Sequence, residues 1–202
     1  QIHFITNPLS ETGMSYLFTW LSFIVTLFWI VGITNTINLI DGLDGLASGV
    51  ASIAATTLLF TAANLGHDFI VMQCAIIAGA SLGFLPFNFN PAKIFMGDTG
   101  SLLLGYMLAV TSVSGMVKSV AAVALAVPVF AMGLPIFDTA FAIIRRYINK
   151  KPIMEADKDH LHHKLMRFGL NQRQTVLIMY FISMLLGIVA VIIADTDPFI
   201  GL

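Results

Sequence analysis

The sequence contains few charged residues and a single cysteine. Only 10% of its 202 residues are Asp, Glu, Lys or Arg, whereas a soluble domain carries about 25%. Because 57% of the residues are hydrophobic, the composition indicates a membrane protein. Cys74 lies in an apolar run, so an intrachain disulfide is excluded and no redox role is indicated. The net charge of −1 gives no indication that nucleic acid is a partner.

A basic segment is also missing in front of the first apolar run, which argues against a signal peptide. The chain begins with Gln1 rather than Met, and we therefore expect it to be a C-terminal portion of a longer protein. About six apolar segments predict an all-α, polytopic membrane protein with one integral-membrane domain over 1–202. The predicted membrane spans are residues 15–34, 46–65, 69–87, 102–117, 119–144 and 175–194.

Three polar segments separate these spans. The first is 35–47 (NTINLIDGLDGLA), the second is 88–101 (NFNPAKIFMGDTGS), and the third is 145–174, the only long one. Eight of the ten basic residues lie in the third segment, and an excess of Lys and Arg marks cytoplasmic loops. Counting back through the spans places all three segments on the cytoplasmic face, where they can form a composite active site.

The first polar segment combines two amides, Asn35 and Asn38, with two carboxylates, Asp41 and Asp44. Asp41 and Asp44 are three residues apart, which would place them on one face of a helical turn. Placing a carboxylate in hydrocarbon costs several kcal/mol of free energy. Carboxylates at a membrane edge therefore favour a function such as binding a hard cation or a polar ligand. The alternative is a set of helix caps and glycine turns.

In the second polar segment, Asp98 lies between glycines at the start of an apolar run. It is a plausible Mg²⁺ ligand, because Mg²⁺ is often held by one or two carboxylates and substrate phosphate oxygens. Asn88 and Asn90 add amides, and Phe95 offers an aromatic face for a base. The alternative is that Asp98 is a helix cap and Phe95 a membrane anchor.

The third polar segment carries a histidine cluster among basic residues. Zinc is disfavoured there, because no cysteine is near and the neighbouring cations repel a metal. Those cations favour a phosphate or pyrophosphate instead, although they also fit a role in fixing topology against anionic lipids. The candidate residues are Arg145, Arg146, His160, His162, His163 and Lys164.

Asp138 is a lone carboxylate inside the fifth predicted span, three residues after Pro135. It either pairs with Arg145 or Arg146 or lines the site, and we favour the structural role. The residues alone therefore predict a cation-assisted phosphate chemistry, and they leave the substrate open.

The three segments closely resemble those of the polyprenyl-phosphate N-acetylhexosamine-1-phosphate transferases, membrane enzymes that begin cell-wall glycolipids. The resemblance rests on NTINLIDGLDGLA, FNFNPAKIFMGDTGS and the run RRYINKKPIMEADKDHLHHKLMRFG, in that order. The sequence HLHH followed by NQRQTV is more similar to the branch that uses UDP-N-acetylglucosamine than to the branch that transfers phospho-MurNAc-pentapeptide.

The resemblance implies transfer of N-acetylglucosamine-1-phosphate from UDP-N-acetylglucosamine to undecaprenyl phosphate, with release of UMP. It implies Mg²⁺, or Mn²⁺ in its place, a bacterial cytoplasmic membrane, contact with membrane lipid and a possible homodimer. Asp98 matches the metal ligand. The expected catalytic residues are Asp41, Asp44, Asp98, His160, His162 and His163, and the expected substrate-binding residues are Asn35, Asn38, Asn88, Phe95, Arg145, Arg146 and Lys164.

Two features depart from the family pattern. The family carries an adjacent Asp-Asp pair on an earlier cytoplasmic loop, and no such pair occurs in this chain. We therefore expect the parent protein to be the transferase and these 202 residues alone to be inactive. Lys158 stands where many relatives have Arg, which keeps a cation but loses a bidentate fork.

Two other functions remain as alternatives to this one. The first is the pentapeptide-transferring relative, which a comparison of the two nucleotide-sugar donors would separate. The second is a transporter, which predicts carboxylates near the middle of the bilayer and an inverted repeat. Here the carboxylates lie at the ends of spans and no repeat is visible, which disfavours a transporter.

Overall fold

The computed structural model describes residues 4–6, 14–16, 18–116, 129–150 and 161–195. Apart from a short antiparallel pair of strands, β1 (Phe4–Thr6) and β2 (Met14–Tyr16), the described elements are helices. The helices are α1 (Thr19–Ile40), α2 (Leu46–Asn64), α3 (Asp68–Asn88), α4 (Gly97–Met116), α6 (Gly133–Ile148), α7 (Leu161–Arg167) and α8 (Gln172–Asp195).

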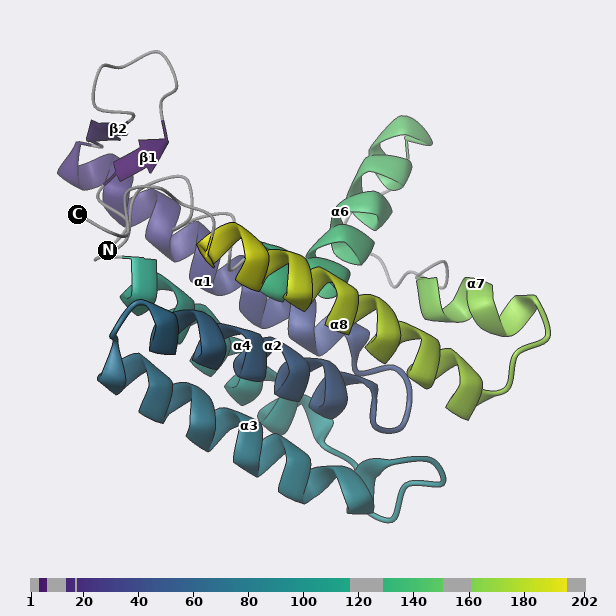
Figure 1. Cartoon of the computed structure of the whole chain (residues 1–202). Coiled ribbons are helices and arrows are strands. Elements are labelled where there is room, and N and C mark those ends of the chain that lie inside the picture. The colour runs from purple at the N-terminus through teal and green to yellow at the C-terminus, as the bar shows by residue number, and fades with distance from the viewer. Residues whose placement is uncertain (1–3, 7–13, 17, 117–128, 151–160, 196–202) are drawn as a thin grey trace.

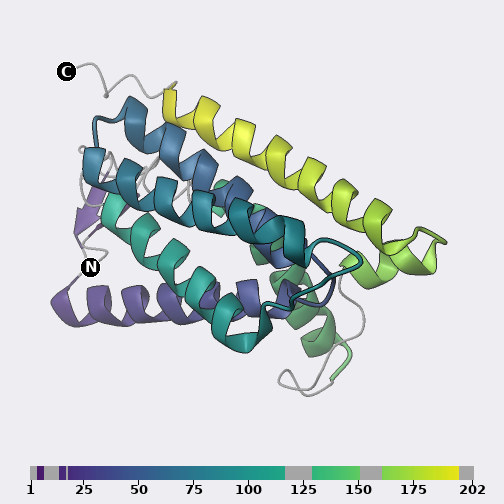
Figure 2. The same ribbon diagram turned by 90° about the horizontal axis from the view of Figure 1, so that it is seen from below.

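Helix α2 forms the centre of a bundle with α1, α3, α4 and α8 (Figures 1 and 2). Its many Ala, Ser and Gly residues are buried and let neighbouring helices approach closely. Gly49 shows how close: a Cβ atom built there would lie 2.1 Å from the ring of Tyr180 in α8. Gly187 of α8 is equally crowded, because a Cβ atom there would lie 2.4 Å from Oγ1 of Thr57.

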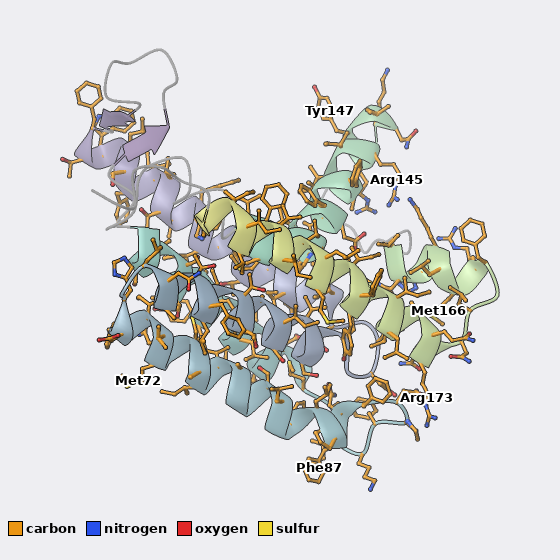
Figure 3. All side chains as sticks on the ribbon, in the orientation of Figure 1. Met72, Phe87, Arg145, Tyr147, Met166 and Arg173 are labelled. Carbon is orange, nitrogen blue, oxygen red and sulfur yellow. The ribbon has the colours of Figure 1, made fainter. Side chains whose placement is uncertain are left out.

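The outer surface of the bundle is apolar. Phe28 of α1 is 79% exposed, and Met72 and Phe87 point outward from α3 (Figure 3). Four of the described helices, α1, α2, α3 and α8, are long and apolar enough to cross a membrane by length and composition. An exposed apolar surface of this extent is typical of a protein in contact with lipid. The chain is therefore a helical membrane protein.

The predicted spans match α2, α3 and α8 to within a few residues. The predicted ends of the spans that correspond to α1, α4 and α6 were wrong. Helix α1 continues to Ile40 and so includes Asn35 and Asn38, which we had expected in a loop. Helix α4 begins at Gly97 instead of 102, and α6 continues past 144 to include Arg145 and Arg146. The start of the fifth predicted span lies outside the described residues, and the total of about six spans stays a prediction.

The polar segments gather at one end of the bundle. The turn after α1, the loop between α3 and α4, and α7 with the start of α8 lie together, opposite the turn between α2 and α3 (Figures 1 and 2). Helix α6 diverges from the bundle toward the same end, with Tyr147 76% exposed near its tip (Figure 3). The predicted convergence of the polar segments therefore occurs.

Candidate functional site

The last turns of α1 bring an amide against the start of α4. Nδ2 of Asn38 donates to Oδ1 of Asp98 at 3.1 Å and to Oγ of Ser101 at 2.8 Å. The two helices pack closely because Gly105 has no side chain: a Cβ there would lie 2.8 Å from Cα of Thr34. Asp98 is thus fixed beside the first polar segment, as expected. Asn35, one turn earlier, donates to the carbonyl of Val31 instead.

Asp41 directly follows the last residue of α1 and lies near two other carboxylates, Asp98 and Asp44. Burial, the charge of Asp98 and the charge of Asp44 raise the pKa of the Asp41 carboxyl from 3.8 to about 6. Charge of one sign concentrated in this way would be offset by a bound cation. The described residues contain no group of three or more His, Cys, Asp or Glu side chains able to hold a metal. A cation beside Asp98 and Asp41 would therefore complete its coordination with water or phosphate oxygens, as Mg²⁺ commonly does.

The raised pKa of Asp41 predicts a stability that depends on pH. In the intact protein without divalent cations, the proton bound in the folded state stabilises it fully below pH 3.8, and this contribution is lost as the pH rises through about 6. We expect Asp41→Asn to raise the melting temperature by a few degrees at pH 7.5 and to leave it nearly unchanged at pH 4. Differential scanning fluorimetry at both pH values measures this, and an equal shift at both would contradict it.

Asp41 and Asp44 do not share a helical face, because α1 ends at Ile40 and residues 41–45 form turns. Gly45 has a φ of +81°, a backbone conformation that glycine adopts without strain. Asp44 instead binds the second polar segment. Its Oδ2 accepts hydrogen bonds from Nδ2 of Asn90 at 3.0 Å and from the backbone N–H of Ala92 at 3.1 Å.

Asn88 is a buried part of the framework under these turns. Its Oδ1 accepts from the N–H of Gly45 at 3.2 Å and from Oγ of Ser48 at 2.9 Å, and its Nδ2 donates to the carbonyl of Ile94 at 3.0 Å. The amide is thus engaged at both ends, which suits a residue that shapes the site. Phe95, in the loop between α3 and α4, is 75% exposed and so presents its ring for stacking.

The third polar segment reaches the first through His162. This side chain is only 1% exposed, and its Nε2 would lie 3.0 Å from a Cβ atom at Gly42. His163 lies beside it, with ring centroids 4.2 Å apart. Oδ1 of Asp138 accepts the N–H of Leu161 at 2.8 Å, which attaches the start of α7 to α6. The contact is structural, as we favoured, but Asp138 also lines the cavity between α6, α7 and α8, so the choice between its two roles stays a prediction. His160 and Lys158 lie outside the described residues.

A mainly apolar cavity lies between α6, α7 and α8, and two cationic residues and the carboxylate of Asp138 contribute to its lining. Its volume is about 210 Å³, and Phe137, Phe141 and Leu186 contribute to its lining. Arg145 from α6 and Lys164 from α7 also line it, and Figure 3 shows Arg145 on α6. Arg146, by contrast, is only 8% exposed.

Sequence reasoning missed four residues that hold the polar segments together: Ser101, Gln172, Arg173 and Tyr180. The hydroxyl of Tyr180 in α8 donates to the carbonyl of Gly45. A tyrosine inside an apolar helix is the one available signal, since a buried phenol usually needs a hydrogen-bond partner. Gln172 was noted only as part of a motif, and Arg173 was also counted among the basic residues that indicate the cytoplasmic face.

Comparisons with known proteins show which sequences this chain resembles. The sequence profile of glycosyl transferase family 4 matches residues 1–116. A Bacillus subtilis (strain 168) protein described as a probable undecaprenyl-phosphate N-acetylglucosaminyl 1-phosphate transferase is 48% identical over 183 residues, which are 91% of this chain and 51% of that protein. A decaprenyl-phosphate N-acetylglucosaminephosphotransferase of Mycobacterium tuberculosis (strain H37Rv) is 40% identical over 202 residues, 91% of this chain and 49% of that protein.

A phospho-N-acetylmuramoyl-pentapeptide-transferase of Staphylococcus aureus (strain Newman) is 47% identical over 106 residues, but these are only 52% of this chain and 32% of that protein. The chain spans about half the length of the first two relatives. Since the family profile covers more than half of the chain, and matches both segments that carry the acidic site, the chain belongs to glycosyl transferase family 4.

Proposed function

We propose that the intact protein transfers N-acetylglucosamine-1-phosphate from UDP-N-acetylglucosamine to undecaprenyl phosphate, releases UMP and so begins a cell-wall glycopolymer. The observation that carries this proposal is the meeting of three polar segments, with Asn38 hydrogen-bonded to Asp98 and His162 packed on Gly42. The relatives that match over nine-tenths of the chain carry names with polyprenyl-phosphate acceptors and N-acetylglucosamine, which supports the choice of substrates.

The reaction joins one phosphate to another and needs charge to be offset. An oxygen of the lipid phosphate attacks the β-phosphorus of the nucleotide sugar, and the bond from that phosphorus to the bridging oxygen breaks as UMP leaves. Asp98, with Asp41 nearby, would hold Mg²⁺ or Mn²⁺, and the metal would offset charge on the pyrophosphate. Asn38 orients the carboxylate of Asp98 through its amide.

Residues of the third polar segment form the proposed phosphate-binding set. His162 lies next to the turn that carries Asp41, and His163 lies beside His162. Arg146, Lys164 and His160 complete the proposed set. Such donors stabilise a transferring phosphoryl group most where water is excluded, which fits the burial of His162. Phe95 stacks on the uracil base, and Asn35 and Asn88 shape the nucleotide site.

The cavity between α6, α7 and α8 suits the lipid acceptor. Its aromatic and aliphatic lining fits an isoprenoid chain, while Arg145 and Lys164 at the same cavity fit the attached phosphate. The excess of basic residues in the third segment supports a site that faces the cytoplasm, in the bacterial plasma membrane. The homodimer stays a prediction.

The test measures UMP release by the purified intact protein in detergent with undecaprenyl phosphate. We expect release with UDP-N-acetylglucosamine, its loss in EDTA, its return with Mg²⁺, and a lipid-linked product one N-acetylglucosamine-1-phosphate heavier by mass spectrometry. Faster release with UDP-MurNAc-pentapeptide would replace this proposal by the pentapeptide-transferring alternative. No release with either donor would overturn the assignment as a transferase.

A further inference from the structure

We propose that Asn90 is a positioning residue that sets the relative placement of all three polar segments, and that Asp44 acts through Asn90 instead of on the substrate. The inference rests on the proposed function for its readout. The sequence assigned Asn90 no role beyond that of an amide in the second polar segment. The sequence predicted that Asp44 is catalytic, whereas here Asp44 is a residue that positions the loop.

The amide of Asn90 joins two segments that are far apart in the sequence. Its Nδ2 donates to Oδ2 of Asp44 at 3.0 Å and to Oε1 of Gln172 at 2.8 Å. An amide nitrogen carries two hydrogens, so both bonds can form at once. Asn90 thereby connects the turn after α1 with the first residue of α8.

The backbone of Asn90 adds a third connection. Its carbonyl accepts from Nε of Arg173 at 2.9 Å, and Figure 3 shows Arg173 reaching from the start of α8 toward the loop after α3. The next residue but one, Ala92, donates its N–H to the same Oδ2 of Asp44 at 3.1 Å. Asp44 therefore holds the loop through two hydrogen bonds on one oxygen.

Short stretches of chain connect the hydrogen bonds of Asn90 to Asp98 and to His162. Asn90 precedes Asp98 by eight residues in the loop that leads into α4. Gln172 follows the last residue of α7 by five residues, and α7 carries His162. A shift of the loop or of the start of α8 would therefore change how Asp98 faces the histidines, and displacements of about 1 Å can cost about 100-fold in rate.

A reciprocal exchange separates positioning from chemistry. In Asn90→Asp, two carboxylates would face each other and the contact would be lost. In Asp44→Asn, the amide oxygen can take the place of Oδ2 and still accept both hydrogen bonds, so the contact would survive without the charge of the carboxylate. In the double variant the asparagine at 44 can donate to the aspartate at 90 and still accept the N–H of Ala92, and the Gln172 amide can rotate to donate. If Asp44 acts only through this contact, the exchange restores the geometry.

We expect Asn90→Asp of the intact protein to lower kcat by about 30- to 100-fold, with a KM for the nucleotide sugar within about threefold of wild type. We expect Asp44→Asn, which keeps the contact, to stay within about fivefold of the wild-type kcat. We expect the double variant to return to within about fivefold of the wild-type kcat. Asn64→Asp, an exposed amide at the far end of the bundle, is the matched control and should leave kcat unchanged. Melting temperatures of all four variants are measured in parallel.

Three results would overturn the proposal. A large loss of kcat in Asp44→Asn that the double variant does not recover would mean that the Asp44 carboxylate itself takes part in the reaction. A wild-type kcat in Asn90→Asp would mean that the contact does not position the site, and a kcat loss that follows only the fraction of unfolded protein would mean a purely structural contact. The wild-type donor assay tests the proposed function separately, because the variants are compared as ratios with whichever donor the wild type uses.

Discussion

Asp98→Asn is expected to reduce turnover by about 10³-fold or more. The substitution preserves the shape of the side chain, and the amide oxygen can still accept the hydrogen bond that Asn38 donates at 3.1 Å. It removes one charge from the place where a cation and the pyrophosphate would meet. A loss of 10³ corresponds to about 4 kcal/mol of transition-state stabilisation. Because the proposed metal ligand is lost, raising the Mg²⁺ concentration should restore only a small part of the rate.

The measurement is kcat for UMP release by the intact protein over a Mg²⁺ titration. Asp68→Asn is the matched control: this carboxylate lies in the first turn of α3, as Asp98 lies in the first turn of α4, but at the opposite end of the bundle. We expect Asp68→Asn to keep the wild-type rate. If Asp98→Asn kept more than a tenth of the wild-type kcat, Asp98 would not be the metal ligand.

The fold could be predicted where the apolar runs were uninterrupted. Helices α2, α3 and α8 follow directly from their composition, because hydrocarbon requires a helix with its backbone hydrogen bonds satisfied internally. The ends of α1, α4 and α6 could not be predicted, because Asn38, Asp98 and Arg145 are polar and were assigned to loops. A helix tolerates polar residues in its terminal turns when their side chains form hydrogen bonds. Asn38 does so with Asp98 and Ser101.

The site was predictable in its residue types but not in its contacts. Carboxylates and histidines at the ends of spans indicated phosphate chemistry, and their convergence followed from counting spans. The partner of Asp44 could not be deduced, since Asn90 lies 46 residues away and its second partner, Gln172, another 82 residues further on. Such pairs depend on how helices pack, which in turn depends on small residues such as Gly49 that carry no chemical signal of their own.

His162→Gln is expected to lower kcat/KM by about 100-fold, within the range that a positioned acid–base group contributes. His162 is 1% exposed and packs on Gly42, between Asp41 and Asp44 in the sequence. Glutamine keeps hydrogen-bonding atoms but has neither the ring nor a group that gains a proton near neutral pH. His163 is half-buried and one position further along α7, so we expect His163→Gln to cost less than about tenfold.

Gly42→Ala tests the same contact without removing the imidazole. A Cβ atom at Gly42 would lie 3.0 Å from Nε2 of His162, closer than such atoms normally approach, so the ring must shift. We expect about a tenfold loss of kcat, because the histidine remains but its placement over the Asp41 turn changes. Gly83→Ala in α3, where a Cβ has no neighbour within 4 Å, is the matched control and should be neutral. Wild-type kinetics in both His162→Gln and Gly42→Ala would place the phosphate-binding cations elsewhere on the chain, because the buried imidazole would then serve only to pack α7 against the bundle.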